Sequence, residues 1–485
     1  MPDFCNTKLA KLLALLDPKE CKLFAKWLDS PWCNNNPRLP PFYRLLLHYY
    51  PGFDQVRCQQ EHLYLTLYPG QNYQSKTMRH LMSELGKQVE RFLIQQQLQK
   101  NTLQQQLLLQ EAYLERHQTE WFEKSSQRTI ADLEAQPSRS WTDLLQLCLL
   151  NEGLYFQPDT TVRHQPEQRV LHRANHYLDA FYALFKYRLA FEFEERRKIM
   201  RGAQEVEVDL PALRRIKDRL GDPALLIFEE HLSIEQPLAL ERYYEIKGLT
   251  LRHMEELSRR NQRDFLYALI NKASRLLLKG HEGMHEEVIE LYKVGLAREL
   301  VISKGRMTDY TFSNIVVLNN LLQRYAEAID FAYTYHTALT EEYQKDGLTW
   351  AQANTYYHSG NYQSAIDHLV DYSFSNGTYD LQGRVLLLHA YFDVFLEDRS
   401  YYSYLFDYGN AFERFVQRSR YYSKQKKSAI TALIRYTRKL SKLQDQYQLS
   451  ERSLDHIYEQ VRSDKSIYAK AWLIKKINNL KDGMG

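Results

Sequence analysis

Apolar residues recur every three or four positions along most of this chain, the spacing of one face of an α-helix. The clearest stretch begins at about Tyr73, and its apolar positions are Leu81, Leu85, Val89, Phe92 and Leu93. From about Trp141 onward one helical pattern follows another, with no alternation of strand and helix patterns. One less regular patch, residues 204–208, predicts an extended segment. The pattern as a whole predicts an all-α protein.

The first hundred residues also carry signals for helix ends. Asp17 is placed to cap a helix, Pro18 occupies the first helical position, and Glu20 completes a capping box. We expect this helix to end before Pro31. A proline-rich loop should follow, and then helices over residues 42–50 and 61–67 and the long helix from Tyr73.

Composition supports long helices over a fold with many turns. The chain has 485 residues but only 18 Gly and 14 Pro, whereas it has 36 Tyr. Sandwiches, barrels and propellers need a turn about every ten residues, so this shortage of turn residues argues against them. No apolar run approaches the roughly 20 residues of a spanning helix. Five cysteines without a Cys-x-x-Cys pair suggest reduced thiols, and we expect a cytoplasmic protein.

The second half of the chain contains an internal repeat. Residues 325–330, Tyr-Ala-Glu-Ala-Ile-Asp, return as Tyr-Gln-Ser-Ala-Ile-Asp at 362–367, 37 positions later. A degraded copy follows at 402–407, and a weaker one precedes them at 285–290. Periods of this size are typical of stacked helix pairs.

The best-formed copy resembles a tetratricopeptide repeat. Ala353 and Tyr356 match its first helix, Gly360 matches its turn, and Ala365 and Leu369 match its second helix. Small residues let the paired helices approach closely. More loosely, the chain resembles a group of long bacterial helical-repeat proteins of no established activity. The segments that carry this second likeness are residues 30–34, 67–70, 290–296 and 384–388.

The repeat resemblance implies a fold and a function. The fold is a right-handed α-solenoid of tetratricopeptide-like helix pairs with an N-terminal helical cap, and we divide it at residues 1–98, 99–280, 281–445 and 446–485. The function is that of a non-enzymatic scaffold that binds a protein or peptide in a groove and needs no cofactor. The residues that match groove-facing places in the repeat are Ser313, Val317, Asn320, Trp350, Asn354 and Tyr357.

Charge is distributed unevenly along the chain. Residues 411–485 carry 17 Lys and Arg against 7 Asp and Glu, while the total net charge is only +4. The densest part runs from Arg414 to Lys442 with no acidic residue inside it. Such a patch suits nucleic acid, an acidic protein or an anionic surface, or it is a solvated helix face. The basic residues singled out are Lys424, Lys426, Lys427, Arg435, Arg438, Lys439 and Lys442.

One short motif suggests zinc chemistry. His281, Glu282 and His285 match His-Glu-x-x-His, in which two histidines one helical turn apart bind zinc and the glutamate acts as the general base. This reading needs an unbroken helix through all five residues. Gly280 and Gly283 each disfavour that helix by about 1 kcal/mol. The zinc metallopeptidase is therefore an alternative to the scaffold and not our first interpretation.

Two further alternatives depend on single helices. His172, His176 and Asp179 have the spacing of a metal site on one helix, although they flank its apolar stripe and suit a solvated face equally well. Residues 61–67 and a helix that opens with Lys76 and Arg79 suit a helix-turn-helix, which together with the basic C-terminal patch keeps a nucleic-acid-associated regulator open. We found no nucleophile elbow, Walker loop or dinucleotide-binding fingerprint.

Overall fold

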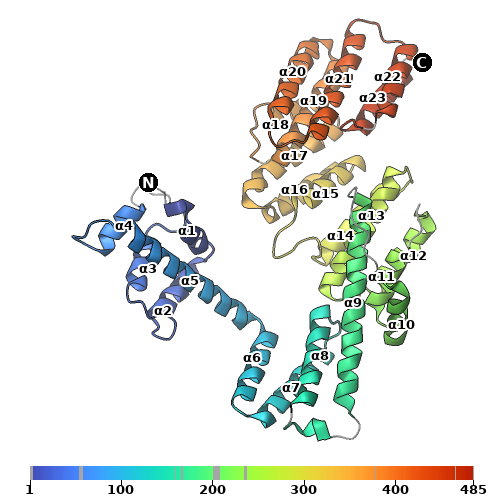
Figure 1. Ribbon diagram of the computed structural model, residues 1–485. Coiled ribbons are helices and arrows are strands. Elements are labelled where there is room, and N and C mark those ends of the chain that lie inside the picture. The colour runs from blue at the N-terminus through green and yellow to red at the C-terminus, as the bar shows by residue number, and fades with distance from the viewer. Residues whose placement is uncertain are drawn as a thin grey trace. The chain divides into compact units, whose positions relative to one another are not determined.

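The computed structural model describes residues 4–53, 58–157, 159–164, 168–199, 208–233, 238–375, 377–464 and 466–483. Every regular element within these residues is a helix (Figure 1), so the predicted all-α class is confirmed. Residues 204–207 of the predicted extended segment lie outside the described part of the chain. Among the described helices, none has the length and apolar character needed to cross a bilayer.

Contacts divide the chain into two compact units. Unit 1 is Met1–Pro137 with Trp141–Phe181, and unit 2 is Ser138–Ser140 with Tyr182–Gly485. The boundary near Phe181 falls within α9 (Arg169–Ile199). The finer division into four parts stays a prediction. The other helices of unit 1 are α1 (Lys8–Leu13), α2 (Pro18–Asp29), α3 (Leu39–Leu47), α4 (Gln60–Leu67), α5 (Ser75–Lys100), α6 (Thr102–Glu115), α7 (Thr119–Glu134) and α8 (Trp141–Phe156).

Unit 2 contains the longer series of helices. They are α10 (Leu210–Leu220), α11 (Pro223–Leu232), α12 (Leu240–Arg252), α13 (Arg259–Leu278), α14 (Met284–Ala297), α15 (Asp309–Leu321), α16 (Tyr325–Tyr335), α17 (Glu341–His358), α18 (Tyr362–Leu369), α19 (Gly377–Glu397), α20 (Tyr402–Arg418), α21 (Lys424–Asp445), α22 (Glu451–Ser463) and α23 (Lys470–Asp482). Short 3₁₀ turns lie at Phe4–Asn6, Thr161–His164, Met254–Glu256, His336–Ala338 and Arg399–Tyr401.

Of two helix starts predicted in unit 1, one is confirmed and the other is wrong. The carboxylate of Asp17 accepts from the backbone N–H of Glu20, and the Glu20 side chain accepts from that of Asp17, so the predicted capping box is confirmed. The helix expected over residues 42–50 instead begins at Leu39. Pro40 and Pro41 lie in its first turn, where a missing backbone N–H leaves no hydrogen bond unmade.

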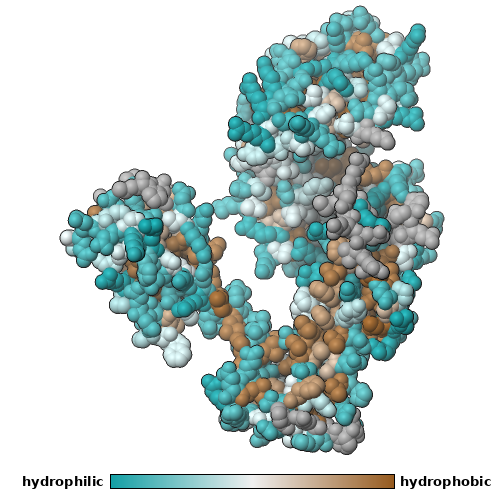
Figure 2. All heavy atoms as spheres, in the orientation of Figure 1, coloured by the Kyte–Doolittle hydropathy of each residue, from teal (hydrophilic) through white to brown (hydrophobic). Residues whose placement is uncertain are grey.

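The helices α6 and α8 of unit 1 keep apolar side chains on their outer surface. Leu109 is 40% exposed, Leu149 is 50% exposed and Phe156 is 59% exposed. Figure 2 shows apolar residues gathered at the surface over this part of the unit. One buried apolar cluster of unit 1 lies where α5 contacts α1 to α4, with the ring of Phe24 4.9 Å from that of Tyr43. Another lies between α7 and α8 and includes Phe122 and Leu147.

The sequence repeat of unit 2 corresponds to a repeated structural position. Tyr325, Tyr362 and Tyr402 are each the first residue of a helix, α16, α18 and α20. Each of these helices contacts the helix before it, and α15, α17 and α19 also contact one another in turn. The hydroxyl of Tyr325 donates to the carbonyl oxygen of His358 at 2.8 Å, which joins one helix pair to the next. From α15 to α20 the chain thus forms three consecutive, packed helix pairs (Figure 1).

Candidate functional site

The residues predicted to line a groove lie mostly inside the helix packing. Val317 is half-buried, and the other five are buried: Ser313, Asn320, Trp350, Asn354 and Tyr357. The side-chain amide of Asn320 donates to Asn354 Oδ1 at 2.9 Å, and the Trp350 ring lies 5.9 Å from that of Tyr379. The structure therefore brings these residues together as contacts between α15, α17 and α19. Their role in binding a partner stays a prediction.

Tyr357 belongs to a buried polar network that holds the last helix. Its hydroxyl donates to Asp393 Oδ2 at 2.7 Å and accepts from the indole N–H of Trp472 at 2.8 Å. Lys476, on the same helix as Trp472, pairs with the other oxygen of Asp393. The ring of His389 stacks on Trp472 with centroids 3.8 Å apart. This network links α17, α19 and α23.

Burial sets the protonation of this network. It raises the pKa of Asp393, while the Lys476 ammonium opposes the shift. Burial also lowers the pKa of His389 well below its ordinary value, and repulsion from Lys476 adds to the effect. In the neighbouring turn of α17, burial lowers the pKa of His358 to about 4. Both histidines are thus neutral in the folded chain near pH 7.

The basic residues predicted to form one patch are divided among different surroundings. Arg438 lies against Gly409 and pairs with Glu413 at 2.8 Å, and Lys439 donates to Gln460 at 3.0 Å. The ammonium of Lys427 donates to the backbone carbonyl of Gln417 at 2.8 Å. The four that are exposed are Lys424, Lys426, Arg435 and Lys442.

The segment with the zinc-binding motif does not form the helix that such a site requires. Gly283 has a φ of +74° and caps α14, which begins only at Met284. His281 therefore lies in the turn before the helix, and His285 lies inside it. His172 and His176 are exposed on α9. Within the described residues, no group of three or more His, Cys, Asp or Glu side chains has the arrangement of a metal site.

The segment with the predicted helix-turn-helix forms two helices, α4 and α5. The second spans 26 residues, and its inner face packs in the core of unit 1 through Leu81 and Leu85. Lys76 and Arg79 are exposed at its start. The nucleic-acid reading of this segment stays a prediction.

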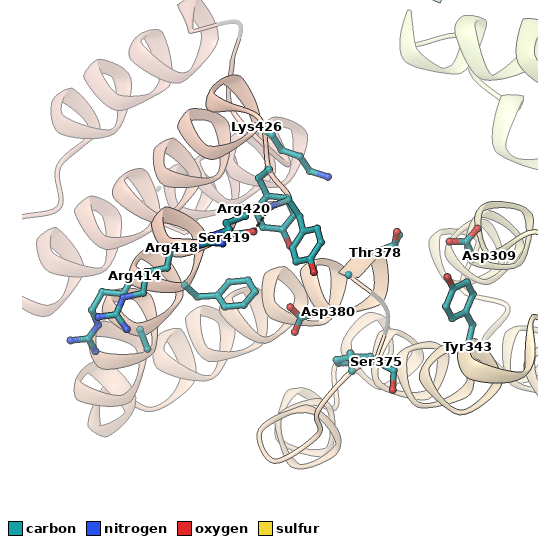
Figure 3. A pocket seen from close by; sticks show the side chains of 16 residues that line it. Asp309, Tyr343, Ser375, Thr378, Asp380, Arg414, Arg418, Ser419, Arg420 and Lys426 are labelled. Atoms are coloured by element: carbon teal, nitrogen blue, oxygen red, sulfur yellow. Dashed lines mark hydrogen bonds between the residues drawn. The ribbon is translucent and has the colours of Figure 1, made fainter. Parts of the chain in front are cut away.

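Unit 2 contains an open cleft of about 1250 Å³. One side is formed by α20 and by the connection from α20 to α21, and the other by the starts of α15, α17 and α19. Figure 3 shows the basic residues on the first side and Asp309 and Tyr343 across from them. Four basic residues line it, namely Arg414, Arg418, Arg420 and Lys426. Its aromatic lining consists of Tyr343, Phe374, Phe415, Tyr421 and Tyr422.

A buried carboxylate fixes the loop at one end of the cleft. Asp346 is 2% exposed; one of its oxygens accepts from the hydroxyl of Tyr372 at 3.0 Å and the other from the backbone N–H of Ser375 at 2.8 Å. Phe374 lies between Tyr372 and Ser375 in the chain. Its ring packs over Gly383, where an added Cβ would lie 2.5 Å from the ring. The absence of a side chain at Gly383 therefore lets Phe374 form part of the cleft wall.

The opposite wall follows the helical spacing of α20. Ala411, Arg414, Phe415 and Arg418 lie at positions i, i+3, i+4 and i+7 and so share one face of the helix. The Phe415 ring is covered by the guanidinium of Arg384 at 3.9 Å. The spacing of these four residues could have predicted a shared helix face. The prediction from sequence instead treated Arg414 and Arg418 only as part of the basic stretch from Arg414 to Lys442.

A second, smaller hollow lies on another face of α21. It has a volume of about 500 Å³ and is lined by Lys424, Lys427 and Arg435 together with Asp464. A hydrogen bond from the Ser466 side chain lowers the pKa of Asp464, so this carboxyl stays ionised among the basic groups. Of the exposed cations of α21, Lys426 thus lines the larger cleft, Lys424 and Arg435 line the smaller hollow, and Lys442 lines neither.

Comparison with known proteins adds no family assignment. No protein-family model matches this sequence, and neither the curated proteins nor the solved structures include a significant match.

Proposed function

We propose that this protein is a non-enzymatic scaffold in which unit 2, an α-solenoid of tetratricopeptide-like helix pairs, holds a segment of a partner polypeptide. The supporting observation is the open cleft of about 1250 Å³ whose walls combine arginines with aromatic side chains. Arginine and tyrosine supply much of the binding energy at protein interfaces. The partner would therefore bind in this cleft, and not at the buried side chains of Asn354 and Tyr357.

Tyr421 makes the proposal testable because it is 96% exposed at the cleft. We would place a photo-crosslinking amino acid at Tyr421 in the full chain, and at Tyr447 as a matched control. Tyr447 is 80% exposed and does not line the cleft. Cross-linking in cells that produce the protein should give one recurrent peptide at position 421 and not at 447. The same yield at both positions would contradict the proposal.

Substitutions in the cleft supply a second arm of this test. Arg414→Glu combined with Arg418→Glu should abolish the cross-link, because both side chains line the cleft. Lys442→Glu changes an exposed charge on α21 that does not line it and should leave the yield unchanged. Substitution of Asn354 or Tyr357 is unsuitable here, since both are buried and would disturb packing.

A nucleic-acid-associated role is a second candidate. The smaller hollow supports it, because Lys424, Lys427 and Arg435 converge there. Phosphate contacts would make the binding steeply dependent on salt. Lys424→Glu with Arg435→Glu should then remove binding to an oligonucleotide at low salt, whereas unchanged binding would exclude this surface.

A further inference from the structure

The arrangement of charge within the cleft indicates what kind of segment it accepts. Arg414 and Arg418 lie one turn apart on α20, both exposed. Like charges at this spacing destabilise a helix by a few tenths of a kcal/mol. In the part of the chain that the structure describes, neither arginine, nor Arg420, forms an ion pair with a carboxylate. This wall is therefore a row of cations that a bound anion would stabilise.

The two carboxylates of the cleft do not neutralise that row. Asp380 is paired with Arg384 at 2.9 Å, and the same Arg384 guanidinium stacks on Phe415. Asp309 lies at the start of α15, across the cleft from the arginines in Figure 3, where its carboxylate accepts from the backbone N–H of Tyr310. The cleft thus has a cationic wall and a facing wall with a net negative charge.

This asymmetry favours a polypeptide over a nucleic acid. A nucleic acid carries a phosphate at every nucleotide and would bring negative charge against Asp309 as well as against the arginines. Single-strand binding also uses open aromatic rings as successive stacking platforms. Here Phe415 has one face covered by Arg384, Phe374 and Tyr422 are half-buried, and Tyr421 alone among the cleft's described aromatic side chains is widely exposed.

We propose that the cleft binds an acidic, amphipathic polypeptide segment, with its carboxylates against Arg414, Arg418 and Arg420 and its apolar side chains against Phe374 and Tyr421. This inference rests on the proposed scaffold function and specifies the partner's chemistry. A guanidinium binds a carboxylate through two parallel hydrogen bonds, and an exposed tyrosine offers a flat apolar surface beside it. Carboxylates spaced four residues apart on a helical segment match the spacing of Arg414 and Arg418.

The experiment begins with selection of a phage-displayed library of random 12-residue peptides on the full-length protein. We expect the selected peptides to be enriched in Asp and Glu with interspersed Leu, Phe or Tyr. A fluorescein-labelled copy of the best binder is then measured by fluorescence anisotropy, together with a copy in which each Asp and Glu is replaced by the corresponding amide. Loss of the carboxylates should weaken binding at least 10-fold and remove most of its salt dependence.

Variants of the protein locate the binding. Arg414→Glu with Arg418→Glu should weaken binding of the acidic peptide at least 10-fold, whereas Lys442→Glu should change it less than 2-fold. A peptide with Lys in place of its Glu residues should recover affinity for the charge-reversed protein. Circular dichroism and thermal unfolding confirm that the variants are folded, which is expected because both arginines are exposed.

The possible outcomes separate this inference from the proposed function. Peptides that bind in the cleft equally well without carboxylates would overturn the acidic specificity and leave the scaffold function standing. If every selected peptide still binds the Arg414→Glu, Arg418→Glu variant and position 421 gives no cross-link, both the acidic specificity and the scaffold function are contradicted. A labelled dT12 oligonucleotide that binds more tightly than the peptides and is lost in that variant would make the cleft a nucleic-acid site instead.

Discussion

At the scale of single residues, the buried histidines near α23 make stability dependent on pH. Burial and the charges of Lys475 and Lys476 lower the pKa of His358 to about 4, from an ordinary value of 6.5. As the pH falls below 6.5, the unfolded chain therefore binds a proton at this position while the folded chain does not. The free energy of unfolding should fall between pH 6.5 and about 4, by up to about 1.4 kcal/mol per pH unit for each such histidine. The pKa of His389 is also lowered in the folded chain, so His389 adds to this loss of stability at low pH.

This prediction is checked by urea unfolding, followed by circular dichroism between pH 5 and pH 8. His358→Gln removes one titrating group, so the loss of stability between pH 6.5 and pH 5 should be smaller than in the unchanged protein. Asp393 acts in the opposite direction because burial raises its pKa, but it does so in both proteins and cancels in the comparison. Equal slopes in the two proteins would contradict the assignment to His358.

The sequence singles out Tyr357 of the buried network but predicts none of its partners. Asn354 and Tyr357 were identified from their places in the repeat, and both do lie at contacts between helix pairs. The buried Tyr357 hydroxyl contacts Asp393 and Trp472, and Trp472 lies 115 positions from Tyr357 along the chain. A pattern with a period of 37 residues carries no information about a contact at that separation. The buried network could therefore not be predicted.

At the scale of elements, the fit of Phe374 over α19 depends on Gly383. Gly383→Ala would place a Cβ 2.5 Å from the Phe374 ring, so the ring or the helix must move. We expect a loss of stability of about 1–3 kcal/mol, as for other overpacked sites, and weaker binding in the cleft. Thermal unfolding and anisotropy with the selected peptide measure the two effects.

Gly248→Ala is the matched control for this prediction. Gly248 lies inside α12, and a Cβ there would meet nothing within 4 Å. Alanine is favoured over glycine in a helix by about 0.5–1 kcal/mol, so this variant should be more stable. If both alanine variants changed stability in the same direction, contact with Phe374 would not be the cause.

Helices were predicted well because their signals are local. The capping box at Asp17, and the tyrosines that begin α16, α18 and α20, are each decided within a few residues. The start of α3 was misplaced for an equally local reason, since prolines are tolerated in the first turn of a helix as well as in loops. The cleft is different, because it requires α15, α17, α19 and α20 to be placed in space.

At the scale of the whole molecule, the two compact units have separate apolar cores. In unit 1, Phe24 is fully buried, with its ring 4.9 Å from Tyr43 and 5.3 Å from Phe92. In unit 2, Asp393 is 4% exposed and is paired with Lys476. Phe24 lies in unit 1 and Asp393 lies in unit 2. A chain with independent cores need not unfold in a single step.

We therefore expect calorimetry of the full chain to show at least two transitions, each sensitive to one substitution. Phe24→Ala creates a cavity that costs about 3–5 kcal/mol and should lower the midpoint of one transition. Asp393→Ala leaves the Lys476 charge buried without its partner, at a similar cost, and should lower the midpoint of the other. The double variant should show both shifts with little coupling, because the two side chains share no partner within the described residues and effects at independent sites add. A single transition that both substitutions lower would instead mean that the cores unfold as one cooperative unit.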